Sequence, residues 1–394
     1  MNNLHIILYS SFPKYSGGRE NWLINILPGI SGAFNKIFLY VYKSDRATFY
    51  DLSPFTNVVL KEVSGLRKKD LLFYILNFIS FKLLFLWDSL FIFRKQVGIL
   101  LRRELKPGDT VLATNSIIEM QPAVDVISEL NNIRLVCIAH GLVPVELGNY
   151  IPYCRKKFEL MEKRLLPLCD VVLANGYDTQ EYLNKHDIDS VVVPNGVNVA
   201  RFQTPDLTGK ELDIIKDLKA NHYRIILMVA TLRKIKGIDD LLMAGKLLKD
   251  MGMNKHKLVF VGKGNVTPFK NKARKFKIEE NVIFMGEQKN IPGLLSLADI
   301  VVCTFGGSGM TLATLEAMAS CRPIVAWDTI MYTQLLTHME DSYLAKHADH
   351  HDLAKGIKML LDDSVLGEKF SKQLVGKAQK FDWNVVTKEL LQYL

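Results

Sequence analysis

The sequence predicts an α/β protein with two doubly wound parallel sheets, each covered by helices on both faces. Three observations carry this prediction. Short apolar runs rich in β-branched residues alternate with helical stretches along the whole chain. The 394 residues exceed the usual size of one domain. An aperiodic stretch at 196–220, with Pro and Gly near its start, divides the runs into two series. Two such series predict two Rossmann-like domains.

Each apolar run has the length of a strand that is buried on both faces. The first series comprises 4–10, 36–42, 109–114, 133–140, 170–175 and 190–195, and the second comprises 224–230, 257–262, 282–286, 299–305 and 323–327. We therefore expect an N-terminal domain over 1–197, a second domain over 198–375, and a closing helix within 376–394 that packs back toward the first domain.

Composition restricts the class of protein. Hydrophobic residues make up 48% of the chain, so two cores can form, and disorder is not indicated. The 50 Lys and Arg residues exceed the 41 Asp and Glu residues, which suits anionic partners without choosing among them. Five cysteines without a C-x-x-C pair argue against a disulfide framework or a zinc site and favour a cytoplasmic protein. The first residues are typical of a strand, not of a signal peptide.

One long apolar segment, 71–93, raises the question of a membrane. Lys82 and Asp88 interrupt it, and two charges near its middle would be costly in a bilayer core, which disfavours a spanning helix. Basic residues flank the segment. Burial against a sheet and peripheral contact of 67–95 with an anionic membrane surface both stay open.

Ligands of open α/β sheets bind beyond the carboxyl ends of the strands, so residues that follow strands are the candidates for a site. With two domains, the expected place is the cleft between them. Gly17 and Gly18 follow the first strand and precede a helix, where backbone amides could approach a ligand closely. His140 is the last residue of the strand at 133–140, at a strand tip where an imidazole can exchange a proton near neutral pH.

Residues that follow strands of the second series are the stronger candidates for a ligand site. Arg233 and Lys236 follow the strand at 224–230, where a basic pair would face a diphosphate. The stretch "GGSGMTLATLEAMASCRP" (306–323) follows the strand at 299–305 and predicts a helix over 310–319 whose glycine-rich start exposes amides to an anion. Glu316 lies in the second turn of that helix. This spacing suits an anion at the helix tip and a diol such as ribose beside the carboxylate.

Other functions are disfavoured. Residues 347–352 ("HADHHD") cluster metal-ligating types, but neighbours in sequence rarely converge on one ion, and 187–189 ("DID") precedes a strand instead of following one. A nicotinamide-dependent oxidoreductase would need the glycine spacing that the first strand lacks. No nucleic-acid recognition module is visible. We therefore predict no metal site, no cofactor and no nucleic acid.

The chain resembles the GT-B glycosyltransferases of family GT4 (glycosyltransferase group 1), which are retaining enzymes with nucleotide-sugar donors. The resemblance runs nearly end to end. It includes "SGGREN", "AHGL" at 139–142, "PNGVNVARF" at 194–202, "LRKIKGIDDLL" at 232–242 and "LEAMASCRPIVA". The order and spacing of these motifs together are specific.

The resemblance implies roles for individual residues. Glu316 matches the second Glu of the family's glutamate pair, which binds the donor ribose, and Lys236 matches the lysine that holds the diphosphate. His140 matches the histidine near the transferred sugar and acceptor. Gly17 and Gly18 match the loop that closes over the phosphates. The resemblance thus implies His140, Lys236 and Glu316 as catalytic residues; the expected donor-binding residues are Gly17, Gly18, Arg233, Lys236, Ser308, Gly309, Met310, Thr311, Leu312 and Glu316.

Three positions depart from the family pattern. Ser308 stands where the first Glu of the pair is usual, Thr231 stands where a phosphate-binding Arg is usual, and Cys321 stands where Gly is usual. Arg233 is the candidate substitute for that Arg. The expected activity is metal-independent transfer of a hexose, with retention, from a UDP-sugar or alternatively a GDP-sugar to a glycan or lipid-linked acceptor in envelope polysaccharide or glycolipid synthesis. The alternative is a degenerate relative that binds nucleotide-sugar or membrane without transfer.

Overall fold

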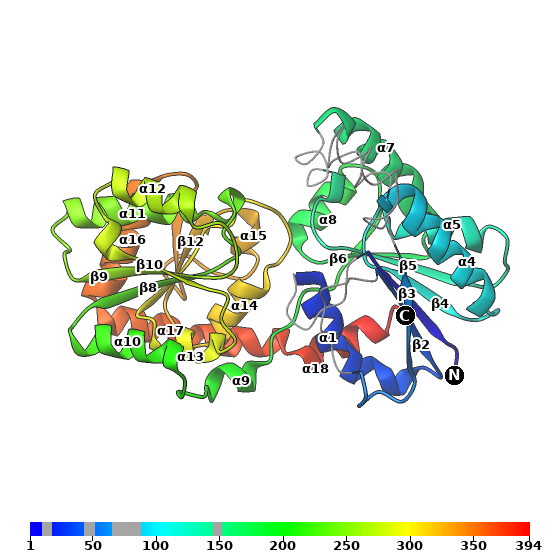
Figure 1. Cartoon of the computed structure of the whole chain (residues 1–394), viewed down its shortest axis with the longest axis horizontal. Coiled ribbons are helices and arrows are strands. Elements are labelled where there is room, and N and C mark those ends of the chain that lie inside the picture. The colour runs from blue at the N-terminus through cyan, green and yellow to red at the C-terminus, as the bar shows by residue number, and fades with distance from the viewer. Residues whose placement is uncertain (10–17, 43–51, 65–87, 145–151) are drawn as a thin grey trace. The chain divides into compact units, whose positions relative to one another are not determined.

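A computed structural model of the chain describes residues 1–9, 18–42, 52–64, 88–144 and 152–394. The chain divides into two compact units (Figure 1). The first unit is Met1–Asn195 together with Trp383–Leu394, and the second unit is Gly196–Asp382. The divisions fall after Asn195 and Asp382, where the sequence placed them after residues 197 and 375. Both chain ends belong to the first unit.

The first unit contains a parallel sheet of seven strands in the order β3-β2-β1-β4-β5-β6-β7. The strands are β1 (Leu4–Leu8), β2 (Ile37–Tyr42), β3 (Val58–Val63), β4 (Thr110–Ala113), β5 (Arg134–Ala139), β6 (Val171–Ala174) and β7 (Val191–Val192). The helices are α1 (Gly18–Ile30), α4 (Arg94–Glu104), α5 (Met120–Ile127), α7 (Arg155–Leu165), α8 (Tyr177–Asn184) and α18 (Trp383–Leu391), and a π-helix spans Asp88–Phe93.

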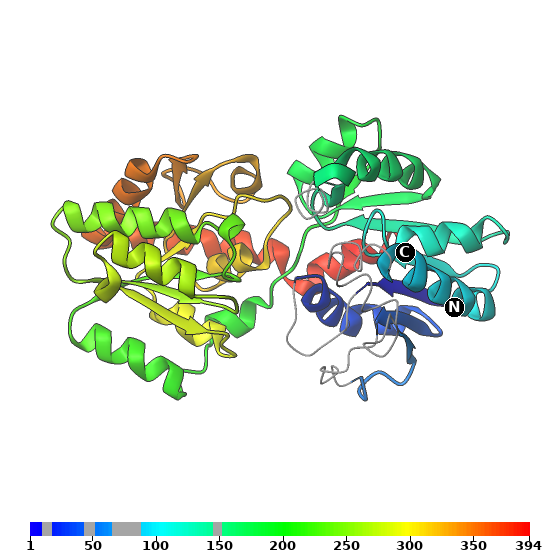
Figure 2. The same cartoon turned by 45° about the horizontal axis from the view of Figure 1, so that its top comes forward.

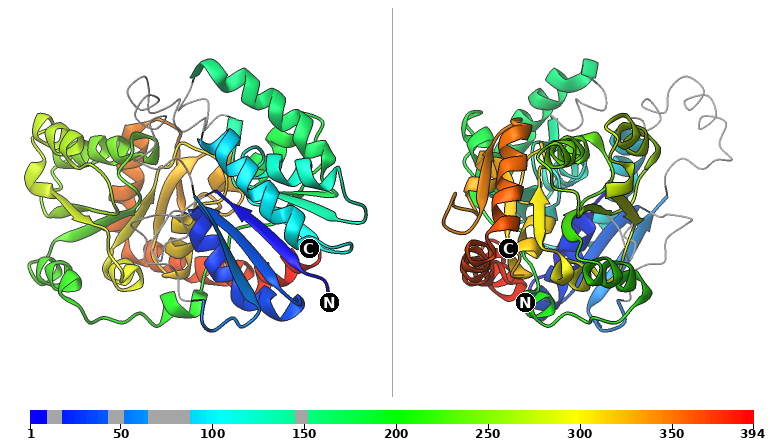
Figure 3. Two further views of the ribbon diagram at one scale, coloured as in Figure 1. Left: turned by 45° about the vertical axis from the view of Figure 1, so that its right-hand side comes forward. Right: turned by 90° about the vertical axis from the view of Figure 1, so that its left-hand side faces the viewer.

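The second unit contains a parallel sheet of six strands in the order β10-β9-β8-β11-β12-β13. The strands are β8 (Arg224–Val229), β9 (His256–Val261), β10 (Val282–Gly286), β11 (Ile300–Cys303), β12 (Ile324–Asp328) and β13 (Tyr343–Lys346). The helices are α9 (Val199–Gln203), α10 (Lys210–Ala220), α11 (Ile238–Asp250), α12 (Thr267–Lys275), α13 (Ile291–Leu297), α14 (Leu312–Ala319), α15 (Ile330–Thr333), α16 (His350–Asp362) and α17 (Ser364–Ala378). Figures 1 and 3 show α11, α12 and α16 on one face of this sheet and α10, α13 and α17 on the other.

The predicted α/β class with two parallel sheets is confirmed. Two strands are absent from the predicted set, β3 and β13, and both lie at the edge of their sheet. An edge strand has one open side, so it tolerates polar residues and a short length. Lys61 and Glu62 interrupt the apolar run of β3, and the apolar run of β13 is only three residues long because Lys346 ends it. The signal of a continuous apolar run is therefore missing from both.

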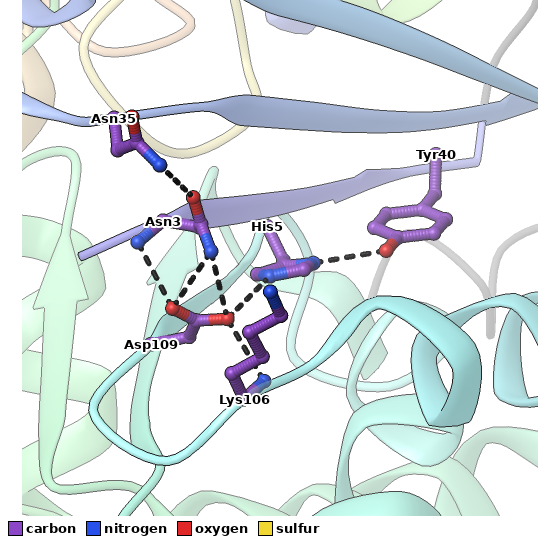
Figure 4. A network of polar contacts seen from close by, with 6 residues as sticks. All are labelled: Asn3, His5, Asn35, Tyr40, Lys106 and Asp109. Atoms are coloured by element: carbon purple, nitrogen blue, oxygen red, sulfur yellow. Dashed lines mark hydrogen bonds and ion pairs between the residues drawn. The ribbon is translucent and has the colours of Figure 1, made fainter.

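A buried polar network joins β1 to β2 and to the start of β4 (Figure 4). Asp109, which is 3% exposed, accepts hydrogen bonds from the Asn3 amide (2.9 Å), the Lys106 amide (2.9 Å) and His5 Nε2 (3.1 Å). The other ring nitrogen of His5 is 2.9 Å from the Tyr40 hydroxyl. Burial alone would raise the pKa of Asp109, but these hydrogen bonds hold that pKa below its usual range. The network therefore ties β1 to β2 and to the residue that precedes β4.

The end of the chain packs on the first unit. Helix α18 lies beside α1 (Figure 2), and a methyl group added at Gly29 would be 2.5 Å from Thr387 Cγ2. The Thr110 hydroxyl donates to the Leu394 carbonyl oxygen (2.9 Å). Helix α17 runs to Ala378, so the helix expected within 376–394 is in fact the end of α17 followed by the separate helix α18.

Helices that could cross a bilayer are absent from the described part of the chain. Most of the apolar segment 71–93, and of the proposed membrane contact 67–95, falls within 65–87, which lies outside the described residues. Both readings of that segment therefore stay predictions.

Candidate active site

Two loops interlock at the carboxyl ends of β8 and β11, which are neighbours in the sheet of the second unit. The Gly306 amide donates to the Ile235 carbonyl oxygen (2.9 Å), and the Thr304 hydroxyl donates to the Gly237 carbonyl oxygen (3.2 Å). Lys236 lies between these two acceptors in a short 3-10 helix, Lys234–Lys236. The structure thus brings Lys236 to the glycine-rich stretch that follows β11.

The loop that follows β8 carries Arg233 and Lys236, which differ in burial and in contacts. Lys236 is half-buried, and its Nζ lies 3.4 Å from the centroid of the Phe305 ring. Arg233 is exposed, and its amide donates to the Thr231 carbonyl oxygen (2.8 Å) in a tight turn. Thr231 Oγ1 is buried and has no hydrogen-bond partner among the described residues. A buried hydroxyl without a partner beside two cations suits a site that a ligand or an ordered water completes.

Helix α14 begins at Leu312, not at residue 310 as expected. Thr311 has an extended backbone, and its hydroxyl accepts a hydrogen bond from the Thr314 amide (3.3 Å), which makes it the N-cap. Gly309 adopts a φ of +79°, and Met310, 3% exposed, packs into the core. Ser308 is half-buried. The first-turn amides that Thr311 leaves unpaired can still face an anion.

Glu316 lies in the second turn of α14, as expected. Burial raises the pKa of its carboxyl to about 7, and the positive charge of Arg201 in α9 opposes this rise. No hydrogen bond or ion pair joins this carboxyl to another residue of the described chain. A half-buried carboxyl with a raised pKa and open oxygens is suited to accept hydrogen bonds from two neighbouring hydroxyls of a ligand.

His140 follows β5 in the first unit. Burial lowers the pKa of its imidazole to about 3, and the charge of Arg19 acts in the same direction. The ring contacts Trp22 of α1 edge-on, with 4.9 Å between ring centroids. His140 Nε2 is buried and has no hydrogen-bond partner within the described ranges. The imidazole is therefore neutral near pH 7 and offers one hydrogen bond to a ligand, not a positive charge.

Gly18 begins α1 and is exposed, and a methyl group added to it would meet no atom within 4 Å. Packing in the described structure therefore does not require a glycine there. Gly17 lies outside the described residues.

Sequence reasoning assigned no role to Phe305, Arg201 or Trp22. Phe305 was placed at the end of a strand over 299–305, but β11 ends at Cys303, so Phe305 belongs to the loop. Arg201 lies in the motif "PNGVNVARF". Its positive charge acts on Glu316 because α9 packs on α14, and the motif does not reveal that packing. Trp22 carried no signal beyond its place in the helix expected after Gly18.

Residues of the 347–352 cluster have other roles. Asp349 caps α16 by accepting hydrogen bonds from the amides of His351 and Asp352 (both 3.1 Å), and His350 Nε2 is 2.8 Å from Asp240 Oδ1. Across the described ranges, no three His, Cys, Asp or Glu side chains are grouped to hold a metal ion.

The family model for glycosyl transferases group 1 matches residues 210–381, and that for glycosyltransferase family 4 matches residues 67–201. A similar curated protein is the N,N'-diacetylbacillosaminyl-diphospho-undecaprenol alpha-1,3-N-acetylgalactosaminyltransferase of Campylobacter jejuni, 26% identical over 51% of this chain and 53% of that protein. The chain thus spans about half the length of the curated relatives it matches.

Solved structures share the fold over the whole chain. The sucrose-phosphate synthase of Thermosynechococcus elongatus has a TM-score of 0.78 at 16% identity and covers 100% of this chain and 98% of its own. Anabaena HepE in complex with UDP has a TM-score of 0.76 at 16% identity, covering 100% and 99%. Identities this low establish the fold alone. With the two family models matching successive parts of the sequence, the chain belongs to the GT-B glycosyltransferases of group 1, family 4.

Proposed function

We propose that the protein transfers a hexosyl group, with retention and without a metal, from a UDP-sugar to a glycan or lipid-linked acceptor, with a GDP-sugar as the alternative donor. The observation that carries the proposal is the carboxyl of Glu316 on α14, which has no partner among the described residues. The loop before α14 is hydrogen-bonded to the loop that carries Arg233 and Lys236. A diol and a diphosphate joined by a short spacer, as in a nucleoside diphosphate, match these groups.

The donor's groups pair with particular residues. Lys236, Arg233 and the first-turn amides of α14 take the diphosphate, because they place positive charge and N–H donors at the carboxyl ends of β8 and β11. Glu316 accepts hydrogen bonds from the ribose hydroxyls. HepE, which shares the fold, is described in complex with UDP, and this supports UDP as the nucleotide.

Transfer breaks the bond between the anomeric carbon and the phosphate oxygen, and the negative charge develops on the leaving diphosphate. Lys236 and Arg233 stabilise that charge by fixed electrostatics, so no metal is needed. The acceptor hydroxyl attacks from the same face, its oxygen bonds to the anomeric carbon, and its proton passes to the departing phosphate oxygen. Ser308 stands where relatives have a carboxylate, so a covalent sugar intermediate has no nucleophile at that position.

His140 acts as a neutral hydrogen-bonding group toward the transferred sugar or the acceptor. With a pKa of about 3, it is not charged at neutral pH and does not serve as a general acid there. Its buried Nε2 gains the hydrogen bond that the described residues do not provide.

The acceptor is a lipid-linked or envelope glycan. The similarity to an enzyme named for a diphospho-undecaprenol-linked acceptor supports this class. Peripheral contact with an anionic membrane through 67–95 belongs to the same proposal, and binding of the purified protein to anionic, but not neutral, vesicles is its measurement.

The test is a panel of UDP- and GDP-sugars incubated with a glycolipid extract as acceptor, with and without EDTA. Product is expected from one donor, unaffected by EDTA, with the anomeric configuration of the donor by NMR, and absent for Glu316→Ala. Binding of a donor without product from any acceptor would favour the alternative of a binding protein that has lost transfer. Product that Glu316→Ala forms at the wild-type rate would contradict the proposed site.

A further inference from the structure

Phe305 and Lys236 face each other because their neighbours in the chain are bonded to each other. Thr304 donates to the Gly237 carbonyl oxygen, and Gly306 donates to the Ile235 carbonyl oxygen. The residues on either side of Phe305 are thus tied to the residues on either side of Lys236. This pairing sets the Lys236 ammonium over the Phe305 ring, 3.4 Å from its centroid.

The backbone and the ring of Phe305 are each confined by a further neighbour. The Phe305 amide donates to the hydroxyl of Tyr332 (2.8 Å), a side chain that is only 1% exposed. A methyl group added at Gly307 would be 2.0 Å from Cζ of the Phe305 ring. The chain therefore keeps a glycine where the ring needs the space. Phe305 has little freedom to move away from the ammonium.

Such a contact changes what a lysine can do for a phosphate. A lysine has four rotatable bonds, and ordering it when a ligand binds opposes binding. The negative face of an aromatic ring attracts an ammonium and restricts it before the ligand arrives. Phe305 also packs against the hydrophobic core of the second unit, so a role in packing alone is the alternative that an experiment must separate.

We infer that Phe305 is a positioning residue for donor binding: its ring holds the Lys236 ammonium at the place where the diphosphate of the donor binds. This inference rests on the proposed function, because it takes Lys236 as a ligand of that diphosphate. Phe305 itself does not touch the reacting atoms. Its effect on the ligand passes through Lys236 and disappears when Lys236 is removed.

A double-mutant cycle tests this inference. The affinity for UDP and for GDP is measured by calorimetry for the full chain and for Phe305→Leu, Phe305→Tyr, Lys236→Met and the pair Phe305→Leu with Lys236→Met. Leucine keeps an apolar side chain and removes the ring face, whereas tyrosine keeps the ring. A matched control is Phe276→Leu, since Lys272 Nζ lies over the Phe276 ring at 5.8 Å, and neither residue belongs to the two loops.

Phe305→Leu is expected to weaken binding of the nucleoside diphosphate roughly 3- to 30-fold, as the strength of a cation–π contact implies. Phe305→Tyr is expected to bind within about twofold of the wild type, and so is the Phe276→Leu control. In the Lys236→Met background, Phe305→Leu is expected to cause no further loss of nucleotide affinity, although it still lowers the melting temperature of the protein.

Two results would overturn the inference. One is an equal loss of affinity from Phe305→Leu with and without Lys236, which would make the ring a packing residue only. The other is no loss from Phe305→Leu at all. Failure of the wild type to bind either nucleotide is a different outcome, because it would reject the proposed function and this inference with it.

Discussion

Gly237 is the residue at which the interlock between the loops after β8 and β11 can be broken most cleanly. It adopts a φ of +79°, and a Cβ added there would lie 2.2 Å from Thr304 Oγ1 and 2.3 Å from the Thr304 carbonyl oxygen. The substitution Gly237→Ala therefore introduces two separate costs, the left-handed backbone of an alanine and a collision with the neighbouring loop. The collision partner includes backbone, which cannot rotate away.

The two costs can be separated within the same unit. Gly252 has a φ of +83°, but a Cβ there would meet no atom within 4 Å, so Gly252→Ala pays only the backbone strain. That strain is about 1 kcal/mol, at the lower end of the values for left-handed residues. Moving a well-packed loop adds about 2 kcal/mol. Gly237→Ala is thus expected to lower the free energy of unfolding by about 3 kcal/mol.

The assay is urea unfolding of both variants followed by the tryptophan signal, together with their affinity for UDP. Gly237→Ala should lose about 2 kcal/mol more stability than Gly252→Ala and should also bind UDP more weakly, because Lys236 precedes the displaced residue. Equal destabilisation by the two substitutions, or wild-type UDP affinity in Gly237→Ala, would refute the interlock.

Three further outcomes are expected. The pKa of Glu316 is raised to about 7 from an ordinary value of 4.5, so the free energy of unfolding of the ligand-free protein should fall by up to about 3 kcal/mol as the pH rises from 5 to 8. Affinity for a UDP-sugar should rise over the same range, because Glu316 loses its proton there and the esterified diphosphate does not titrate. Calorimetry should show both trends absent in Glu316→Gln. Cys321, with a φ of +55° just after α14, should become more stable by about 1 kcal/mol as Cys321→Gly in thermal unfolding. Asp109→Ala should lower the free energy of unfolding by about 3 kcal/mol, since it leaves the Asn3 and Lys106 amides unpaired, and unchanged stability would contradict the network.

Much of the fold follows from local pattern. Strands buried on both faces carry continuous apolar runs, and these predicted β1, β4 and β8 within a residue or two at each end. The edge strands β3 and β13 were not predicted, because Lys61 and Glu62 interrupt the apolar run of β3 and the apolar run of β13 is only three residues long. The start of α14 was misplaced by two residues, since Met310 continues the apolar pattern while Thr311 supplies the cap.

Part of the candidate site could likewise be predicted from local sequence, and part could not. Lys236 and Glu316 could be named from their place after strands and from the family motifs, because both signals are local. The contact between Lys236 and Phe305 could not, since it arises from two loops that are about 70 residues apart and meet only when β8 pairs with β11. The neutral state of His140 likewise depends on burial against Trp22, which no motif reports.

The place of the donor can be measured directly by backbone hydrogen exchange of the full chain with and without saturating UDP. The account predicts that protection by the nucleotide concentrates in 231–237 and 304–319, the two interlocked loops and α14. Wild-type binding with protection elsewhere in the second unit, and none in those two segments, would contradict it.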